Sequence, residues 1–310
     1  MISTIENRFL SDCLPWLEEH KSDLLSQIQK KGALLLKSFH VANLETFSKI
    51  ANFFEAENTD YSGGASPRKR ISETVFTATE MDPSYEINFH NELAYAREQP
   101  LYLIFHCRRA ASKGGYTSLC SSRDFIDRLP AHLFDEISTE KVSYVRRLRS
   151  RKNWALSEPW EDVFLCETKK EVEQKCRQLG YSFAWENDTL IIKTVRKLFE
   201  KHPVTEELVF FSSLFILRPW FKTPMKELFL AMGKDSVSSD VTWENGDTIS
   251  FKLMEELYKV MKMCAIEIKW KKNDILFVDN FQFSHSRHTF EGNRELYVSL
   301  CKAENYNGYK

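Results

Sequence analysis

Two short segments that lie far apart in the chain contain residues of the types that bind transition metals. The first is Phe89–Glu92, in which His90 and Glu92 are two positions apart, and the second is Asp279–Arg287, which contains His285. In extended backbone, residues two positions apart point to the same face. If the fold brings a second histidine to this pair, two imidazoles and one carboxylate can bind a metal and leave open positions opposite. Such a set is typical of non-haem Fe(II) sites that react with O2.

A buried arginine is expected shortly after the second segment. The segment Arg294–Leu300 alternates with a period of two, which predicts a strand with Arg294 on the same face as Leu296, Val298 and Leu300. Those apolar residues should face the core, and an unpaired charge there is very costly. A guanidinium fork fits a carboxylate at two points. The expected partner of Arg294 is therefore either an acidic side chain of the protein or a bound dicarboxylate.

The sequence contains eight histidines, so more than one of them could supply the second imidazole. His288 is the main rival of His285. The two are three positions apart, so in a strand they face opposite ways and only one can point inward. Another histidine, His106, lies in an apolar segment and is expected to be a core residue.

With these residues the chain resembles the TauD/TfdA family of Fe(II)/2-oxoglutarate-dependent dioxygenases, most closely its clavaminate synthase-like and SyrP-like branch. The resemblance runs from about Tyr61 to Leu300, and its motifs occur in the family order. The matching pieces are residues 66–68 (Ser-Pro-Arg), 90–95, 114–117, 279–287 and 290–294, with Trp270 and Asp274 ahead of the fourth.

The resemblance implies a role for each matching residue. His90, Glu92 and His285 would bind Fe(II), while Arg294 and Thr117 would hold the distal carboxylate of the cosubstrate 2-oxoglutarate. The implied reaction uses O2 to hydroxylate an unactivated C–H bond of a small molecule, with succinate and CO2 as coproducts. A carboxylate ligand at Glu92 argues against halogenation, whereas desaturation or another oxidative outcome remains an alternative.

The substrate is less constrained than the reaction. Members of the branch that this chain resembles often act on amino acids, either free or attached to a carrier protein. Candidate substrate residues are Arg68, Arg218 and Trp220. An open basic rim formed by the run at residues 146–152 would suit a carrier, although such a run is more commonly a solvated face.

Two other classes of function compete with the oxygenase. A metal-dependent hydrolase or isomerase could use the same three ligands with another ion, but it would not need the dicarboxylate clamp of Arg294 and Thr117. A binding or scaffolding protein on the same fold is the other alternative. The departures from the family pattern at Asn273 and Ser286 leave it open.

Composition limits the partners. The formal net charge of the 310 residues is −1, which favours neither nucleic acid nor an anionic membrane surface. No segment approaches the roughly 18 apolar residues of a membrane-spanning helix, and no signal peptide is evident. Seven cysteines without Cys-x-x-Cys spacing favour reduced thiols. We therefore expect a cytoplasmic protein with a small-molecule partner, not a nucleic acid or membrane partner. Its oligomeric state is not predicted.

The elements that must position these residues are mainly strands. With the resemblance, they indicate a mainly β, α+β fold, a double-stranded β-helix or jelly roll. We expect a single domain over residues 1–310, with a helical region at 1–60, a jelly-roll core at 61–300 and a helical insertion at about 146–190. The local predictions are a helix over 14–31 that stops at Gly32, a strand at 33–36, helices after the N-caps Asn43 and Ser250, a capping box at Thr168, a hairpin over 181–192 and irregular chain at 146–160.

Overall fold

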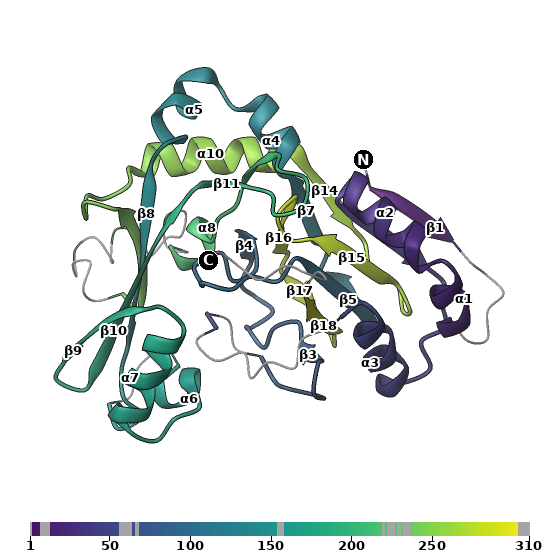
Figure 1. Cartoon of the computed structure of the whole chain (residues 1–310), viewed down its shortest axis with the longest axis horizontal. Coiled ribbons are helices and arrows are strands. Elements are labelled where there is room, and N and C mark those ends of the chain that lie inside the picture. The colour runs from purple at the N-terminus through teal and green to yellow at the C-terminus, as the bar shows by residue number, and fades with distance from the viewer. Residues whose placement is uncertain are drawn as a thin grey trace.

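The computed structural model describes residues 2–6, 13–55, 64–65, 68–153, 158–218, 221, 227, 231 and 237–302. A six-stranded sheet occupies the right half of the view in Figure 1. Its first two strands are parallel to each other, and its other neighbouring strands are antiparallel. In spatial order the strands are β1 (Ser3–Glu6), β2 (Ala33–Lys37), β15 (Ile275–Asp279), β5 (Tyr102–Arg109), β18 (Glu295–Cys301) and β3 (Phe76–Thr77).

A four-stranded antiparallel sheet packs against the first. Its order is β14 (Ala265–Ile268), β7 (Thr117–Ser121), β16 (Phe283–Arg287) and β4 (Ile87–His90). Apolar side chains from both sheets meet in one core, among them Leu35, Phe105, Val278, Val298, Leu119, Ile268 and Phe283. These two sheets around a shared core form the jelly roll that the resemblance implied.

Strand β18 has the predicted alternation. Leu296, Val298 and Leu300 face the core between the sheets, whereas Tyr297 and Cys301 face a second core on the other side of the six-stranded sheet. The inward face of β18 is therefore the face on which Arg294 was expected.

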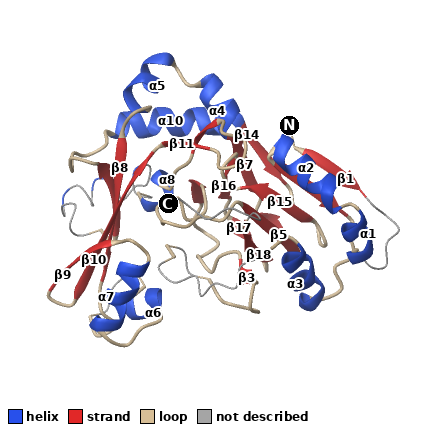
Figure 2. Ribbon diagram, in the orientation of Figure 1, coloured by secondary structure: helices blue, strands red, loops and turns tan. Residues whose placement is uncertain are grey.

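Three helices cover the outer face of the six-stranded sheet (Figure 2). They are α1 (Leu14–Glu19), α2 (Lys21–Lys31) and α3 (Leu44–Phe53). The helix predicted over 14–31 is broken at His20, where the backbone leaves the helical conformation. Gly32 ends α2 in the left-handed region with φ of 74°, and Asn43 caps α3 through a 2.9 Å bond from the Thr46 N–H, both as predicted.

A second group of helices packs on the outer side of the four-stranded sheet, around a core that includes Phe89 and Cys120. These helices are α4 (Ser122–Arg128), α5 (Ala131–Ile137), α8 (Leu214–Leu217) and α10 (Phe251–Cys264). Ser250 caps α10 by accepting a hydrogen bond from the Leu253 N–H, as predicted. No helix in the described part of the chain is long and apolar enough to cross a membrane.

The range that was predicted as a helical insertion, about 146–190, contains strands as well as helices, and these strands belong to a second four-stranded sheet. The sheet order is β13 (Ser239–Trp243), β8 (Lys141–Leu148), β10 (Thr189–Lys197) and β9 (Ser182–Glu186), and α6 (Trp160–Phe164) and α7 (Lys169–Gln178) pack beside it. The prediction of irregular chain from residue 146 was wrong, because β8 continues to Leu148 by pairing with β10. The capping box at Thr168 and the hairpin of β9 and β10 are confirmed. The described residues also form two short strand pairs: β11 (Phe199–Lys201) with β12 (Leu208–Phe210), and β6 (Lys113–Gly114) with β17 (Phe290–Glu291).

Candidate metal and cosubstrate site

Strand pairing in the four-stranded sheet brings the two candidate metal-binding segments together. Strand β16 lies between β4 and β7, and its His285 is directly opposite His90. The potential ligand atoms of His90, Glu92 and His285 all lie within 4.8 Å of one another. The three residues are only 7%, 3% and 6% exposed, respectively. The rival His288 instead turns away, with its Nε2 2.7 Å from the Ser118 hydroxyl.

The surroundings of His90 and His285 favour the neutral imidazole, which is the form that can bind a metal. Burial is the main cause of the lowered pKa of His90 and of His285, and the positive charge of Arg68 lowers both further. His90 Nδ1 lies 2.9 Å from the carbonyl oxygen of Asn88, which can only accept, so Nδ1 carries the proton and Nε2 presents a lone pair. His285 Nδ1 is buried and has no hydrogen-bond partner among the described residues.

Asn280 fixes the backbone that carries the carboxylate. Its side-chain oxygen accepts a 2.7 Å bond from the Glu92 N–H, and its Nδ2 donates to the Glu92 carbonyl at 3.0 Å. Asn91 Nδ2 in turn donates to the Asn280 carbonyl. The segment before His285 and the segment that contains Glu92 are thus bound directly to each other. Asn280 lay in a segment that the sequence singled out, but no role was predicted for it.

A buried pair supports the turn that leads into β16. His202 Nε2 lies 2.9 Å from Asp279 Oδ2, and both side chains are fully buried. His202 Nδ1 accepts bonds from two backbone N–H groups, so Nε2 must donate to the carboxylate. Asp279 Oδ1 accepts from the N–H groups of Phe281 and Gln282. No local pattern indicated a role for His202, because it lies 77 residues from its partner.

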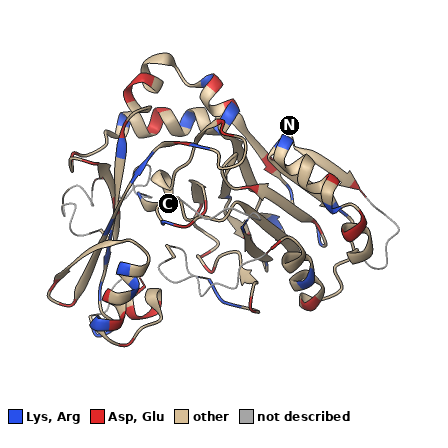
Figure 3. Cartoon of the chain, in the orientation of Figure 1, with Lys and Arg blue, Asp and Glu red and all other residues tan. Residues whose placement is uncertain are grey.

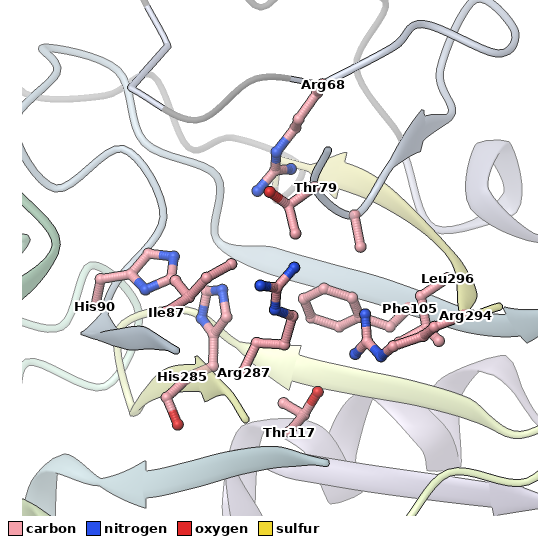
Figure 4. Close-up of a pocket in the computed structure, with 12 residues that line it drawn as sticks. Arg68, Thr79, Ile87, His90, Phe105, Thr117, His285, Arg287, Arg294 and Leu296 are labelled. Atoms are coloured by element: carbon pink, nitrogen blue, oxygen red, sulfur yellow. The ribbon is translucent and has the colours of Figure 1, made fainter. Parts of the chain in front are cut away.

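A cavity of about 40 Å³ is lined both by His90 and His285 and by the predicted cosubstrate residues Thr117 and Arg294. Figure 4 places His90 and His285 at one side of it, with Thr117 and Arg294 farther along. Its lining is Arg68, Ala78, Thr79, Ile87, His90, Phe105, Thr117, His285, Ser286, Arg287, Arg294 and Leu296. Three arginines line this small space together with apolar side chains, so the cavity favours an anionic ligand.

Arg294 has no acidic partner in the described part of the chain. Its Nε donates to the Gly115 carbonyl at 3.0 Å, and its guanidinium carbon lies 5.6 Å from the centre of the Phe290 ring. Burial, and then the nearby charge of Arg287, lowers the pKa of Arg294 to about 10. Of the two partners considered from the sequence, the structure therefore favours a bound anion.

Thr117 presents its hydroxyl to the same cavity. Its Oγ1 accepts a 2.9 Å hydrogen bond from Trp270 Nε1, and both side chains are buried. An indole N–H can only donate, so the hydroxyl hydrogen of Thr117 remains to be donated to another acceptor. Trp270 was recognised as part of a motif, but its contact with Thr117 was not predicted.

Comparison with known proteins identifies the family. The model of the "Taurine catabolism dioxygenase TauD, TfdA family" matches residues 4–300. The chain belongs to this family. It is therefore a TauD/TfdA dioxygenase, whose class depends on Fe(II) and 2-oxoglutarate.

Individual TauD/TfdA relatives are distant. The dapdiamide synthesis protein DdaC of Enterobacter agglomerans is 25% identical over 276 residues, which are 88% of this chain and 83% of DdaC. A clavaminate synthase-like protein of Arabidopsis thaliana is 24% identical over 294 residues, covering 92% and 86% of the two chains. The crystal structure of PvcB from Pseudomonas aeruginosa has a TM-score of 0.56 at 14% identity and covers 97% of this chain and 85% of PvcB. Another structure of PvcB, with a TM-score of 0.53, is described as an Fe, alpha-ketoglutarate dependent oxygenase from an isonitrile synthetic pathway and covers 91% and 80% of the two chains at 14% identity.

The donor set of this TauD/TfdA chain fits the cofactors of its family. Two neutral imidazoles and a carboxylate suit Fe(II), and a positively charged cavity next to them suits a dicarboxylate. The residues that the resemblance assigned to Fe(II) and to 2-oxoglutarate could therefore hold both groups.

One arginine of the site was missed by the sequence argument. Arg287 is two positions after His285 in β16 and lines the cavity. Its Nη1 donates to the carbonyl of Met81, and its Nη2 donates to those of Asp82 and Tyr85, at 2.7–2.8 Å. These bonds tie the loop between β3 and β4 to the site. The two-residue spacing from His285 could have indicated Arg287.

The three candidate substrate residues have different surroundings. Arg68 lines the cavity and forms a buried ion pair with Glu92. Arg218 does not line it: this side chain is fully buried, donates to the carbonyls of Val241 and Ile249 and lies 3.4 Å from Asp240. The position of Arg218 favours a structural role over contact with substrate. Trp220 lies outside the described residues.

The basic run at 146–152 is not a uniform solvated face. Arg146 is only 6% exposed and donates to the carbonyl of Gly64 at 2.9 Å. Arg151 is exposed but pairs with Asp162 and Glu167. Figure 3 shows acidic and basic residues mixed around α6 and α7. The expectation of a solvated face was therefore wrong for Arg146.

Proposed function

We propose that this chain hydroxylates an unactivated C–H bond of a free, amino-acid-derived small molecule that carries a carboxylate. Iron would be held by His90, Glu92 and His285, and 2-oxoglutarate would be converted to succinate and CO2. The observation that carries the proposal is that His90 and His285, whose ligand atoms lie within 4.8 Å of that of Glu92, line the same cavity as Arg294 and Thr117.

The proposed roles of the protein side chains follow from their environment. Arg294 would pair with the far carboxylate of 2-oxoglutarate, and the Thr117 hydroxyl would donate to the same group. Ile87, Phe105 and Leu296 would keep water from the cavity between the clamp and the metal ligands. The iron and the cosubstrate supply the oxidising chemistry, while these residues supply position and dryness.

The substrate class rests on three kinds of support. Amino acids are common substrates in the branch that the sequence resembles, and one relative is a dapdiamide synthesis protein. Arg287, two positions after His285, supplies a positive charge in the same cavity that would favour a substrate carboxylate. The run at 146–152 is partly buried and partly neutralised, so it supports a free substrate over one attached to a carrier protein.

A turnover assay with a substrate panel tests this function. The iron-loaded protein is incubated with O2, 2-oxoglutarate and single amino acids or their N-acyl derivatives, and succinate and product masses are measured by mass spectrometry. We expect one group of carboxylates to stimulate succinate formation and to gain one oxygen atom, with no turnover by the His285→Ala variant.

Three other outcomes of this assay would change or contradict the proposed function. A product that lacks two hydrogens would identify a desaturase. Product formed only from amino acids attached to a carrier protein would contradict the free-substrate part of the proposal. Equal succinate formation by the wild type and the His285→Ala variant would contradict the assigned metal site.

A further inference from the structure

The candidate metal-binding carboxylate already has a cationic partner inside the protein. Arg68 Nη2 lies 2.5 Å from Glu92 Oε2, and the two side chains are only 3% and 4% exposed. Arg68 comes from the segment before β3, 24 residues earlier in the chain. Figure 4 shows its guanidinium extending into the site from the side opposite Thr117.

This contact involves one particular oxygen of Glu92. A glutamate can bind a metal through one carboxylate oxygen or through both. Its side chain also has one more rotatable bond than aspartate, so its carboxylate needs more support to keep one orientation. Asn280 fixes the Glu92 backbone on both its N–H and its carbonyl, whereas Arg68 contacts the end of the side chain.

The number of metal positions that Glu92 occupies matters for the proposed reaction. An octahedral metal held by three protein atoms has three further positions. A cosubstrate that chelates through its keto group and near carboxylate uses two of them, and O2 needs the third. If both oxygens of Glu92 bound the metal, one of these positions would be lost.

We propose that Arg68 is a positioning residue that holds Oε2 of Glu92 and thereby limits this ligand to a single-oxygen contact with the metal. The inference rests on the proposed function, because it assumes that Glu92 is a metal ligand. It assigns Oε1 to the metal and Oε2 to Arg68. Hydrogen-bond partners of metal ligands typically change metal affinity or activity by about 10- to 100-fold when they are removed.

The test uses Mn(II) as a probe and counts the water molecules bound to it by pulsed electron paramagnetic resonance in labelled water. The wild type should hold three waters, whereas Arg68→Met and Arg68→Gln should hold two because Glu92 becomes a two-oxygen ligand. Both variants should also bind Mn(II) about 10- to 100-fold more weakly. Arg68→Lys keeps a cation at this position and should retain three waters.

Arg294→Met is the matched control, because it removes another arginine of the cavity that does not contact Glu92. It should weaken 2-oxoglutarate binding but leave three waters on Mn(II). Thermal melting of each variant separates loss of folding from the specific effect. The wild-type protein alone is also decisive, because a Mn(II) crystal structure with both Glu92 oxygens on the metal would overturn the inference whatever the variants do.

The results also separate this inference from the proposed function. If the wild type fails to bind Mn(II), or binds it without Glu92, the proposed function itself fails. If Mn(II) binds to the three predicted ligands but the Arg68→Met and Arg68→Gln proteins keep three waters and full affinity for Mn(II), only the role assigned to Arg68 is refuted.

Discussion

The hydrogen bond between Trp270 and Thr117 predicts how strongly substitutions at these two residues should weaken 2-oxoglutarate binding. Thr117→Val keeps nearly the same volume but removes the hydroxyl proposed to donate to the cosubstrate carboxylate. A hydrogen bond to a charged group contributes about 1.5–3 kcal/mol. The dissociation constant of 2-oxoglutarate should therefore rise about 10- to 150-fold.

Trp270→Phe should weaken 2-oxoglutarate binding less than Thr117→Val does, because it only removes the bond that orients the Thr117 hydroxyl. It keeps an aromatic ring next to Phe105, whose ring centre lies 6.4 Å away, but removes the 2.9 Å bond that orients Thr117. A neutral hydrogen bond contributes about 0.5–1.5 kcal/mol, which corresponds to roughly 2- to 12-fold in affinity.

The two substitutions must be measured singly and together. Isothermal titration of 2-oxoglutarate into Mn(II)-loaded protein gives each affinity without turnover. Since Trp270 is proposed to act through Thr117, the double variant should bind no more weakly than Thr117→Val alone. Fully additive losses, or a Trp270→Phe protein with unchanged affinity, would refute this reasoning.

Three further predictions concern the clamp, the response to acid and the support of β16. Arg294→Lys retains the charge but loses the fork, so 2-oxoglutarate should bind at least about 10-fold more weakly in the same titration; unchanged affinity would exclude the clamp. Burial lowers the pKa of His106 from 6.5 to about 4. The unfolded chain therefore takes up a proton first as the pH falls, and up to about 3 kcal/mol of stability should be lost between about pH 6.5 and pH 4. Urea unfolding of His106→Gln should show a correspondingly smaller loss over that range, and an equal loss would assign the effect to other groups. Gly32→Ala should lower the melting temperature because φ is 74° and the new Cβ would lie 2.4 Å from Phe283 Cε2. Gly246→Ala is also at positive φ, but no atom lies within 4 Å of its new Cβ, so this variant should lower the melting temperature less. Equal decreases in the two variants would show that backbone strain alone, and not the contact with Phe283, causes the loss of stability.

Local signals in the sequence predicted much of the framework. The capping box at Thr168, the N-cap at Asn43 and the alternation in β18 each depend on residues a few positions apart, and the structure confirms them. The sequence also identified the segments that the fold brings together at His90 and His285.

Contacts between distant segments could not be predicted in the same way. Strands β14 and β15 are separated by only a few residues in the sequence but belong to different sheets. The partners of Glu92, Asp279 and Thr117 lie 24, 77 and 153 residues away, so these contacts depend on strand register and loop paths rather than on local pattern. The same limit applies to Arg218, because burial against β13 could not be distinguished from exposure to substrate in one sequence.

The most direct test of the central claim is an anaerobic titration of the metal-free protein with Fe(II) and then 2-oxoglutarate, monitored by the weak visible metal-to-ligand charge-transfer band. We expect the band in the wild type, its loss in His285→Ala, and a need for much more cosubstrate in Arg294→Ala. The absence of the band from the wild type at saturating iron and 2-oxoglutarate would contradict the proposed site and the function built on it.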